Sequence, residues 1–256
     1  MQMLLKPERR ESSLTPHPAP LITEGGCLMG RRLLLAAPML VAVLVVGGVA
    51  LALSACGGAG GQEQAKARPL PQYEHPLRSG EYHSVKFNPP LSFKVSKPWS
   101  NTAEQLSDWI ELGYEGDTGF ISFANVKKVF KPGTIKVVDA PKDLVGWLQQ
   151  NPYLKTSKPQ PVTVGGVKGE QLEVVVDHLP KDYYGNCGTD CLDIFYQSGG
   201  EQIGYFNAIN RERRVFVLED VKGETVAIWF ASTADKFDKF APEAQKVVDS
   251  VKWSGS

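Results

Sequence analysis

The stretch R-V-F-V-L-E-D-V-K-G-E-T-V-A-I-W-F-A, residues 214–231, decides the fold. Its two halves, Arg214–Glu219 and Glu224–Ala231, are rich in β-branched and aromatic residues, which favour strands. Lys222-Gly223 lies between the halves and suits a tight turn, because glycine adopts the positive φ that hairpin turns need. The stretch therefore predicts an antiparallel hairpin.

A helix is expected directly after this hairpin. A polar cap near Thr233–Asp235 precedes apolar residues that recur at spacings of three and four, and Trp253 closes the element. This spacing predicts one apolar stripe that packs against a sheet. The stripe consists of Phe237, Phe240, Ala244, Val247, Val248 and Val251.

Strand patterns also dominate the chain before the hairpin. A short helix is expected from an Asp139-Ala140-Pro141 cap to Asn151-Pro152. The expected strands are Tyr82–Phe87, Leu91–Val95, Leu106–Tyr114, Gly119–Val126, Val162–Val164, Gly169–Val176 and Leu192–Tyr196. Sequential hairpins without a βαβ rhythm predict the α+β class, an antiparallel sheet covered by helices, in a single domain over residues 81–256.

The N-terminal region has the layout of a secretion signal. Arg31-Arg32 precede the uncharged apolar run Leu33–Leu53, and small residues follow. Leu53, Ser54, Ala55 and Cys56 resemble the lipobox of bacterial lipoproteins at each of its four positions. That resemblance implies recognition of Leu53, Ser54 and Ala55 by a signal peptidase, cleavage before Cys56, and a lipid on the Cys56 sulfur.

The apolar run is also long enough for a transmembrane helix, which is the alternative. Against it, the run ends in the lipobox, and a Gly-, Gln- and Pro-containing spacer follows where a basic flank would stop transfer. We therefore expect residues 1–28 to be a non-native or disordered extension before a start at Met29. Residues 29–55 are the expected signal peptide, and 56–80 the lipidated cysteine and a flexible tether.

The order of elements resembles PsbP-like domains and the LpqN-type lipoproteins of actinobacteria. The resemblance implies a sheet flanked by helices and a non-catalytic binding or accessory role. It transfers no functional residue to this chain. The segments that carry it are Pro90–Val95 with Trp99, Val164–Gly169, Ala241–Val247 and Asp249–Trp253.

Cys187 and Cys191 are four residues apart in a turn-rich segment. Outside the cell a disulfide is the expected state of such a pair. A redox role is the first alternative, although the pair lacks Cys-x-x-Cys spacing. A zinc site is the second, and His178 with Asp177 or Asp190 would have to supply the remaining ligands.

Aromatic residues near this pair are the candidate binding residues: Tyr183, Tyr184, Tyr205 and Phe206. They line a binding face or pack beneath a long loop, and the sequence favours neither. Arg211–Arg214 is expected to be a solvated hairpin edge, with a contact to anionic headgroups or glycans as the alternative.

The charge balance and the motifs of the sequence narrow the classes of function that are expected. Beyond Cys56 the chain has 23 Lys or Arg and 25 Asp or Glu, which gives no basic footprint for nucleic acid. No catalytic motif, metal site or cofactor site is expected, and His75, His83 and His178 are unpaired in sequence. We expect a lipid-anchored extracytoplasmic module that binds an envelope protein, glycan or lipid. An envelope hydrolase with a non-sequential site and a structural surface protein are the alternatives.

Overall fold

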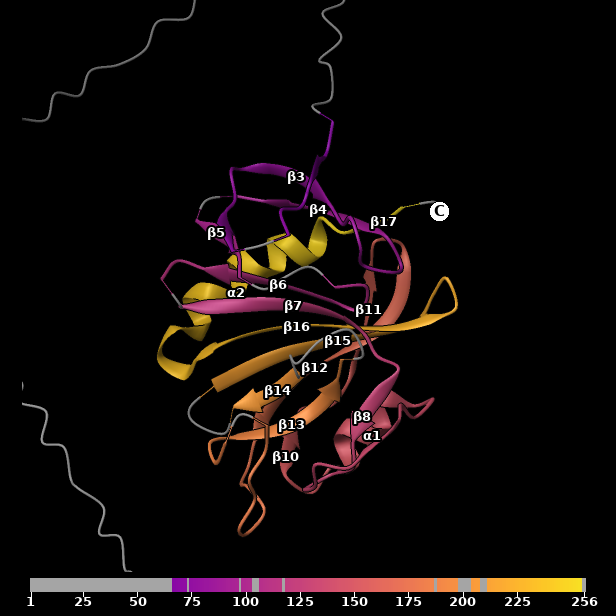
Figure 1. Cartoon of the computed structure of the whole chain (residues 1–256), viewed down its shortest axis with the longest axis vertical. Helices are drawn as coiled ribbons and strands as arrows, with labels where there is room; N and C mark the ends of the chain where they lie inside the picture. The colour runs from indigo at the N-terminus through magenta and orange to yellow at the C-terminus, as the bar shows by residue number, and fades with distance from the viewer. Residues whose placement is uncertain are drawn as a thin grey trace, which may run out of the picture. The chain divides into compact units, whose positions relative to one another are not determined.

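The computed structural model describes residues 66–72, 74–96, 98–102, 106–116, 118–186, 188–197 and 211–254, and the backbone of residues 204–207. They belong to one compact unit, Gly60–Ser256. Within them the chain forms a nine-stranded sheet, two four-stranded sheets and two helices (Figure 1). The expected signal peptide, including Leu53, Ser54, Ala55 and Cys56, lies outside the described residues.

The nine-stranded sheet forms the centre of the unit. Its strand order is β10-β12-β15-β16-β7-β6-β5-β2, β11 pairs with β12, and all neighbours are antiparallel. Its strands are β2 (His75–Pro76), β5 (Trp99–Asn101), β6 (Trp109–Tyr114), β7 (Gly119–Asn125), β10 (Leu154–Thr156), β11 (Gln160–Val164), β12 (Val167–Val176), β15 (Arg211–Val221) and β16 (Glu224–Thr233).

The central hairpin is confirmed. Phe216 of β15 pairs with Ile228 of β16, and Lys222 and Gly223 form the bend with φ of 57° and 84°. Two consecutive residues with positive φ form the kind of tight turn whose twist matches the right-handed twist of the two strands.

One face of the central sheet is covered by α2 (Ala234–Asp249) and a four-stranded sheet. The strands of this small sheet, in the order β1-β3-β4-β17, are β1 (Arg68–Pro69), β3 (Gly80–His83), β4 (Leu91–Val95) and β17 (Lys252–Trp253). Trp253 fastens the C-terminal strand, since its Nε1 donates to the Val164 carbonyl at 3.1 Å.

The other face is covered by α1 (Leu144–Gln150) and a second four-stranded sheet. In the order β14-β13-β8-β9, its strands are β14 (Gly204–Asn207), β13 (Cys191–Tyr196), β8 (Lys128–Phe130) and β9 (Val137–Asp139). Two apolar cores therefore lie on opposite sides of one sheet, as the layers in Figure 1 illustrate.

This double coverage explains the composition of β16. Ile228 and Phe230 enter the core under α2, whereas Ala227 and Trp229 enter the core under α1. Since successive side chains of a strand point to opposite faces, a strand covered on both faces is apolar at nearly every position.

Several details differ from the sequence expectation. Arg211–Arg214 is not a solvated edge, because β15 is paired on both sides and Arg213 is 1% exposed. The C-terminal helix ends at Asp249, and Trp253 lies in β17. Asp143, not Asp139, caps α1: its Oδ1 accepts the Gly146 N–H at 2.6 Å, and Asp139 ends β9. The described part of the predicted tether is folded onto the domain, because Leu70 and Leu77 are only 2% and 3% exposed. The folded unit thus begins before Glu81, and a tether drawn to residue 80 is too long.

Candidate functional site

The segment before β13 contains the aromatic residues singled out from the sequence. Tyr183 is half-buried and donates its hydroxyl to Asp193 Oδ2 at 3.0 Å, whereas Tyr184 is 73% exposed. The backbone of Tyr205 and Phe206 lies in β14, where they pair with Asp193 and Leu192, and their side chains lie outside the described residues. The side chain of Tyr183 therefore points into the domain, and that of its neighbour Tyr184 points into solvent.

Asp193 organises this segment. Its carboxylate is 1% exposed, and Oδ2 also accepts the Asn186 backbone N–H at 3.0 Å and the Asn186 Nδ2 at 2.8 Å. Burial raises the pKa of Tyr183 to about 12. Sequence reasoning missed Asp193; the signal was an acidic residue inside the buried strand run of β13.

Cys191 begins β13 and is buried. Cys187 lies outside the described residues, so the disulfide between Cys187 and Cys191 stays a prediction. Among the described residues, no group of three or more His, Cys, Asp or Glu side chains is placed to hold a metal ion.

Of the described histidines, His75 and His178 are exposed and His83 is half-buried. His178 contacts Asp177 Oδ2 at 3.1 Å and packs edge-on against the ring of Tyr153, while Lys155 pairs with the same Asp177. His83 Nδ1 lies 3.2 Å from the Ala67 carbonyl oxygen. Neither contact is the hydroxyl- or thiol-to-imidazole pair that a nucleophilic hydrolase uses.

A polar cluster on the central sheet was also missed by sequence reasoning. Glu111 of β6 accepts hydrogen bonds from Ser122 Oγ at 3.0 Å and Thr102 Oγ1 at 3.4 Å. Burial raises the pKa of Glu111, and the charge of Arg211 works against that shift. A carboxylate with two hydroxyl donors can accept hydrogen bonds, and no described contact brings a second acid to it for general acid–base chemistry.

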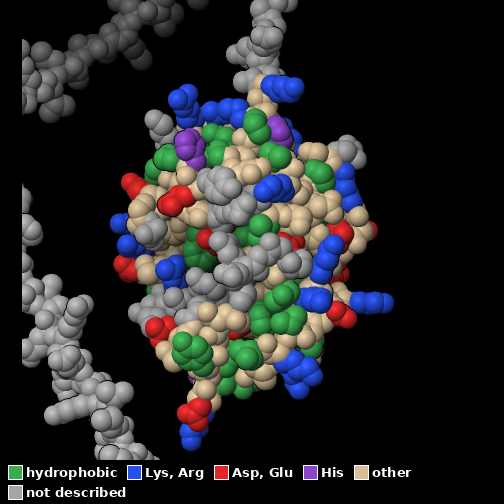
Figure 2. All heavy atoms as spheres, in the orientation of Figure 1, with side chains coloured by type: hydrophobic (Ala, Val, Ile, Leu, Met, Phe, Trp, Pro, Cys, Tyr) green, Lys and Arg blue, Asp and Glu red, His purple; other side chains and the backbone are tan. Residues whose placement is uncertain are grey.

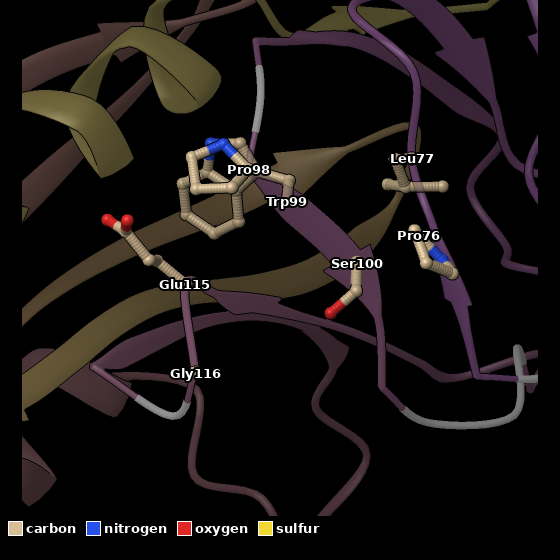
Figure 3. Close-up of a pocket in the computed structure, with 7 residues that line it drawn as sticks. All are labelled: Pro76, Leu77, Pro98, Trp99, Ser100, Glu115 and Gly116. Atoms are coloured by element: carbon tan, nitrogen blue, oxygen red, sulfur yellow. The ribbon is translucent and has the colours of Figure 1, made fainter. Parts of the chain in front are cut away.

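A hollow lies where β5 meets the turn after β6 (Figure 3). Its volume is about 380 Å³. Pro98, Trp99 and Ser100 come from β5 and the residue before it, and Glu115 and Gly116 from the turn, with φ of 30° and 55°. The complete lining is Pro76, Leu77, Pro98, Trp99, Ser100, Glu115 and Gly116.

Trp99 forms the rigid base of this pocket. It is 2% exposed and packs against Tyr114 with ring centroids 4.9 Å apart and against Phe240 at 6.0 Å. Its Nε1 has no hydrogen-bond partner within the described part of the chain.

The electrostatics of the pocket are acidic. Glu115 is the sole ionisable residue among the seven that line it. Burial raises the pKa of the neighbouring Tyr114, and the charges of Glu243 and Glu115 raise it further. An apolar hollow with one carboxylate can hold a ligand and orient a positive group, but it contains no acid–base pair.

A second hollow of about 260 Å³ lies beside α1 and is lined by Val145, Lys168, Gly169, Glu170, Val217 and Glu219. Its floor is sheet backbone, since a Cβ on Gly169 would lie 2.2 Å from the Val217 carbonyl oxygen. Its lining combines the positive Lys168 with the negative Glu170 and Glu219, so its charge does not indicate one class of ligand.

These features define an α+β domain in which β-sheets are covered by helices. No family model and no curated protein matches the chain. Similar solved structures include cyanobacterial PsbP (CyanoP) from Synechocystis sp. PCC 6803, at 12% identity and a TM-score of 0.36, covering 78% of this chain and 98% of that chain.

A second similar structure is LpqN, described as involved in cell envelope biogenesis of Mycobacterium tuberculosis. It shares 12% identity at a TM-score of 0.30 and covers 70% of this chain and 89% of that chain. Both groups named from the sequence are therefore found among the similar structures, and the similarity concerns the fold alone. No helix within the described residues is long and apolar enough to cross a membrane.

Proposed function

We propose that this chain is an extracytoplasmic lipoprotein, anchored by lipid on Cys56, whose folded domain binds a small ligand at the Trp99 pocket. The observation that carries the binding role is the pocket itself: an apolar hollow on a rigid aromatic base with a single carboxylate at its edge. Its volume of about 380 Å³ lies in the usual range for small-molecule sites.

The proposed location outside the cytoplasm rests on residues 31–56. An arginine pair, an apolar run and Leu53-Ser54-Ala55-Cys56 together favour export and lipidation. Two acyl chains on one cysteine suffice for stable membrane attachment, whereas a single chain is marginal. An oxidising location also favours a disulfide between Cys187 and Cys191, which would brace the segment that Asp193 organises.

The lining predicts the chemical class of the ligand. Pro76, Leu77, Pro98 and Trp99 offer apolar contact, and Glu115 attracts a positive group. Because Glu115 is exposed, its attraction is screened and is worth about 0.2–1 kcal/mol. The ligand class is a small apolar or aromatic group that carries an ammonium or another cationic donor.

Three probes of one shape test this assignment: benzylamine, benzyl alcohol and benzoate. Binding is followed by NMR shifts of the Trp99 indole and the Gly116 amide in the wild type and in two variants. We expect benzylamine to bind about two- to fivefold more tightly than benzyl alcohol, and benzoate to bind most weakly. Glu115→Gln should remove the preference for the amine, and Pro98→Ala should weaken all three probes.

Glu212→Gln is the matched control, because Glu212 is an exposed carboxylate on β15 that does not line the pocket. It should leave the order of the probes unchanged. If the three probes bind equally, or shift resonances away from residues 98–116, the pocket assignment is wrong.

Mass spectrometry of the protein extracted from native membranes tests the anchor. A mature N-terminus at Cys56 with the added mass of diacylglycerol is expected, with the peptides of Cys187 and Cys191 linked. An unmodified N-terminus upstream of Cys56 would overturn the lipoprotein assignment.

A further inference from the structure

The small sheet β1-β3-β4-β17 has one face in the core and one face in solvent. Leu91, Phe93 and Val95 of β4 point inward, so Lys94 points outward with Ser92. Lys252 lies opposite Ser92 in the register of β17 and β4 and also points outward. Two lysines therefore lie on the solvent face of this sheet.

Further basic side chains surround this face. Lys66 precedes β1, Arg78 precedes β3, and Lys86 lies in the β3–β4 connection; all three are exposed. We call Lys66, Arg78, Lys86, Lys94 and Lys252 the basic face. Figure 2 shows Lys and Arg side chains gathered along the edge of the molecule where β3 and β4 lie in Figure 1.

Glu81 also lies on this face, opposite Lys94 in the register of β3 and β4. Glu81 pairs with Lys252 Nζ at 3.0 Å. The hydrogen bond from Lys252 and the charges of Lys252 and Lys94 lower the pKa of Glu81.

The charge is unevenly distributed along the chain. Residues 66–96 carry five Lys or Arg against two Asp or Glu, although the chain beyond Cys56 carries 23 against 25. The basic face is thus positive on a domain that is otherwise acidic.

An exposed apolar side chain accompanies these charges. Val85, next to Lys86, is 53% exposed and is one of three large apolar side chains exposed to this degree among the described residues. An apolar tip flanked by a lysine suits the boundary between lipid headgroups and acyl chains.

The length of the tether restricts which side of the domain meets the membrane. Nine residues, 57–65, separate Cys56 from Lys66. They span about 35 Å at full extension and roughly 16–19 Å as a random coil. A compact unit of the size of Gly60–Ser256 is about 40 Å across. The side that carries Lys66 and β1 therefore stays nearest the anchor.

The geometry points to a membrane-docking surface: the basic face lies against anionic phospholipid headgroups of the bilayer that holds Cys56, with Val85 at the headgroup boundary. This inference rests on the proposed lipid anchor and adds an orientation to it. Each lysine or arginine near an anionic surface strengthens binding about fivefold, equivalent to about 1 kcal/mol.

The test uses the full lipidated chain, inserted into vesicles of phosphatidylcholine alone or mixed with phosphatidylglycerol. Flotation with the neutral vesicles measures the anchor. Amine-reactive labelling, quantified by peptide mass spectrometry, measures docking at Lys86 and Lys94. Lys181 is the internal control, because it is exposed in the segment before β13, whose sheet covers the opposite face of the central sheet.

We expect Lys86 and Lys94 to be labelled at least fivefold more slowly on anionic than on neutral vesicles, with no change at Lys181. High salt should remove the difference. In the variant K86Q/K94Q, the docking equilibrium should weaken roughly 25-fold if the two contributions are independent, so protection of Lys252 should be lost, whereas K181Q should leave it unchanged.

Three other outcomes would each overturn one part of the proposal: the docking, its lipid partner or the anchor. A chain that floats with neutral vesicles but labels Lys94 and Lys181 alike on anionic ones is anchored without docking. Protection that appears only in native membranes indicates a protein partner in place of lipid. A chain that does not float with neutral vesicles refutes the anchor, and the docking falls with it.

Discussion

Replacing Asp193 with alanine removes the acceptor on which the segment before β13 is built. Three donors lose their partner: the Tyr183 hydroxyl and the backbone and side-chain nitrogens of Asn186. Hydrogen bonds to a charged group contribute about 1.5–3 kcal/mol each, but Asn186 is exposed and its nitrogens can turn to water. The loss therefore corresponds to little more than one such bond, about 3 kcal/mol.

For a domain of this size, about 3 kcal/mol lowers Tm by roughly 6–12 °C. Urea unfolding of residues 60–256, followed by tryptophan fluorescence, gives the free energy directly. Tyr183→Phe removes one donor to the Asp193 carboxylate and should cost about 1.5–3 kcal/mol. The double variant should be less destabilised than the sum of the single variants, because both remove the same bond. A change below about 0.5 kcal/mol for Asp193→Ala would refute the view that this carboxylate organises the segment.

Two further predictions concern the central sheet. Gly169→Ala should cost about 3 kcal/mol in urea unfolding, because its Cβ would lie 2.2 Å from the Val217 carbonyl oxygen. Gly166→Ala, where φ is 84° and the Cβ meets nothing within 4 Å, should cost only about 1 kcal/mol, and equal losses would contradict the packing argument. Glu111 has a raised pKa in the folded state, so its contribution to stability is complete below the ordinary glutamate value and is lost as pH rises through the folded value. Stability measured from about pH 4 to 7 should therefore fall less in Glu111→Gln than in the wild type, and parallel curves would contradict a raised pKa of Glu111.

Local patterns identified most of the framework. The β15–β16 hairpin and the apolar stripe of α2 were both predictable, since turn chemistry and side-chain period depend on neighbours in sequence. The helix α1 was predicted with the wrong cap. Asp139 and Asp143 both precede it, and only the fold places Asp139 at the end of β9.

The pocket and the buried acids could not be predicted in this way. Trp99 and Glu115 meet because β5 pairs with β6, and Glu111 meets Ser122 because β6 pairs with β7. These contacts depend on strand register, which no local pattern around either residue specifies. The folding of Leu70 and Leu77 onto the domain was missed for the same reason, because their prolines and polar neighbours are typical of a tether.

The sequence by itself determined the α+β class, the central hairpin, the C-terminal helix and the prediction of a lipid anchor at Cys56. Each depends on periodicity, turn residues or a short motif, which act over a few neighbouring residues. Only the tertiary structure decided that two cores share one sheet, that Tyr183 turns inward while Tyr184 faces solvent, and that basic residues gather around the sheet of β1, β3, β4 and β17. These features arise where distant segments pack together, and burial and charge there depend on the whole fold.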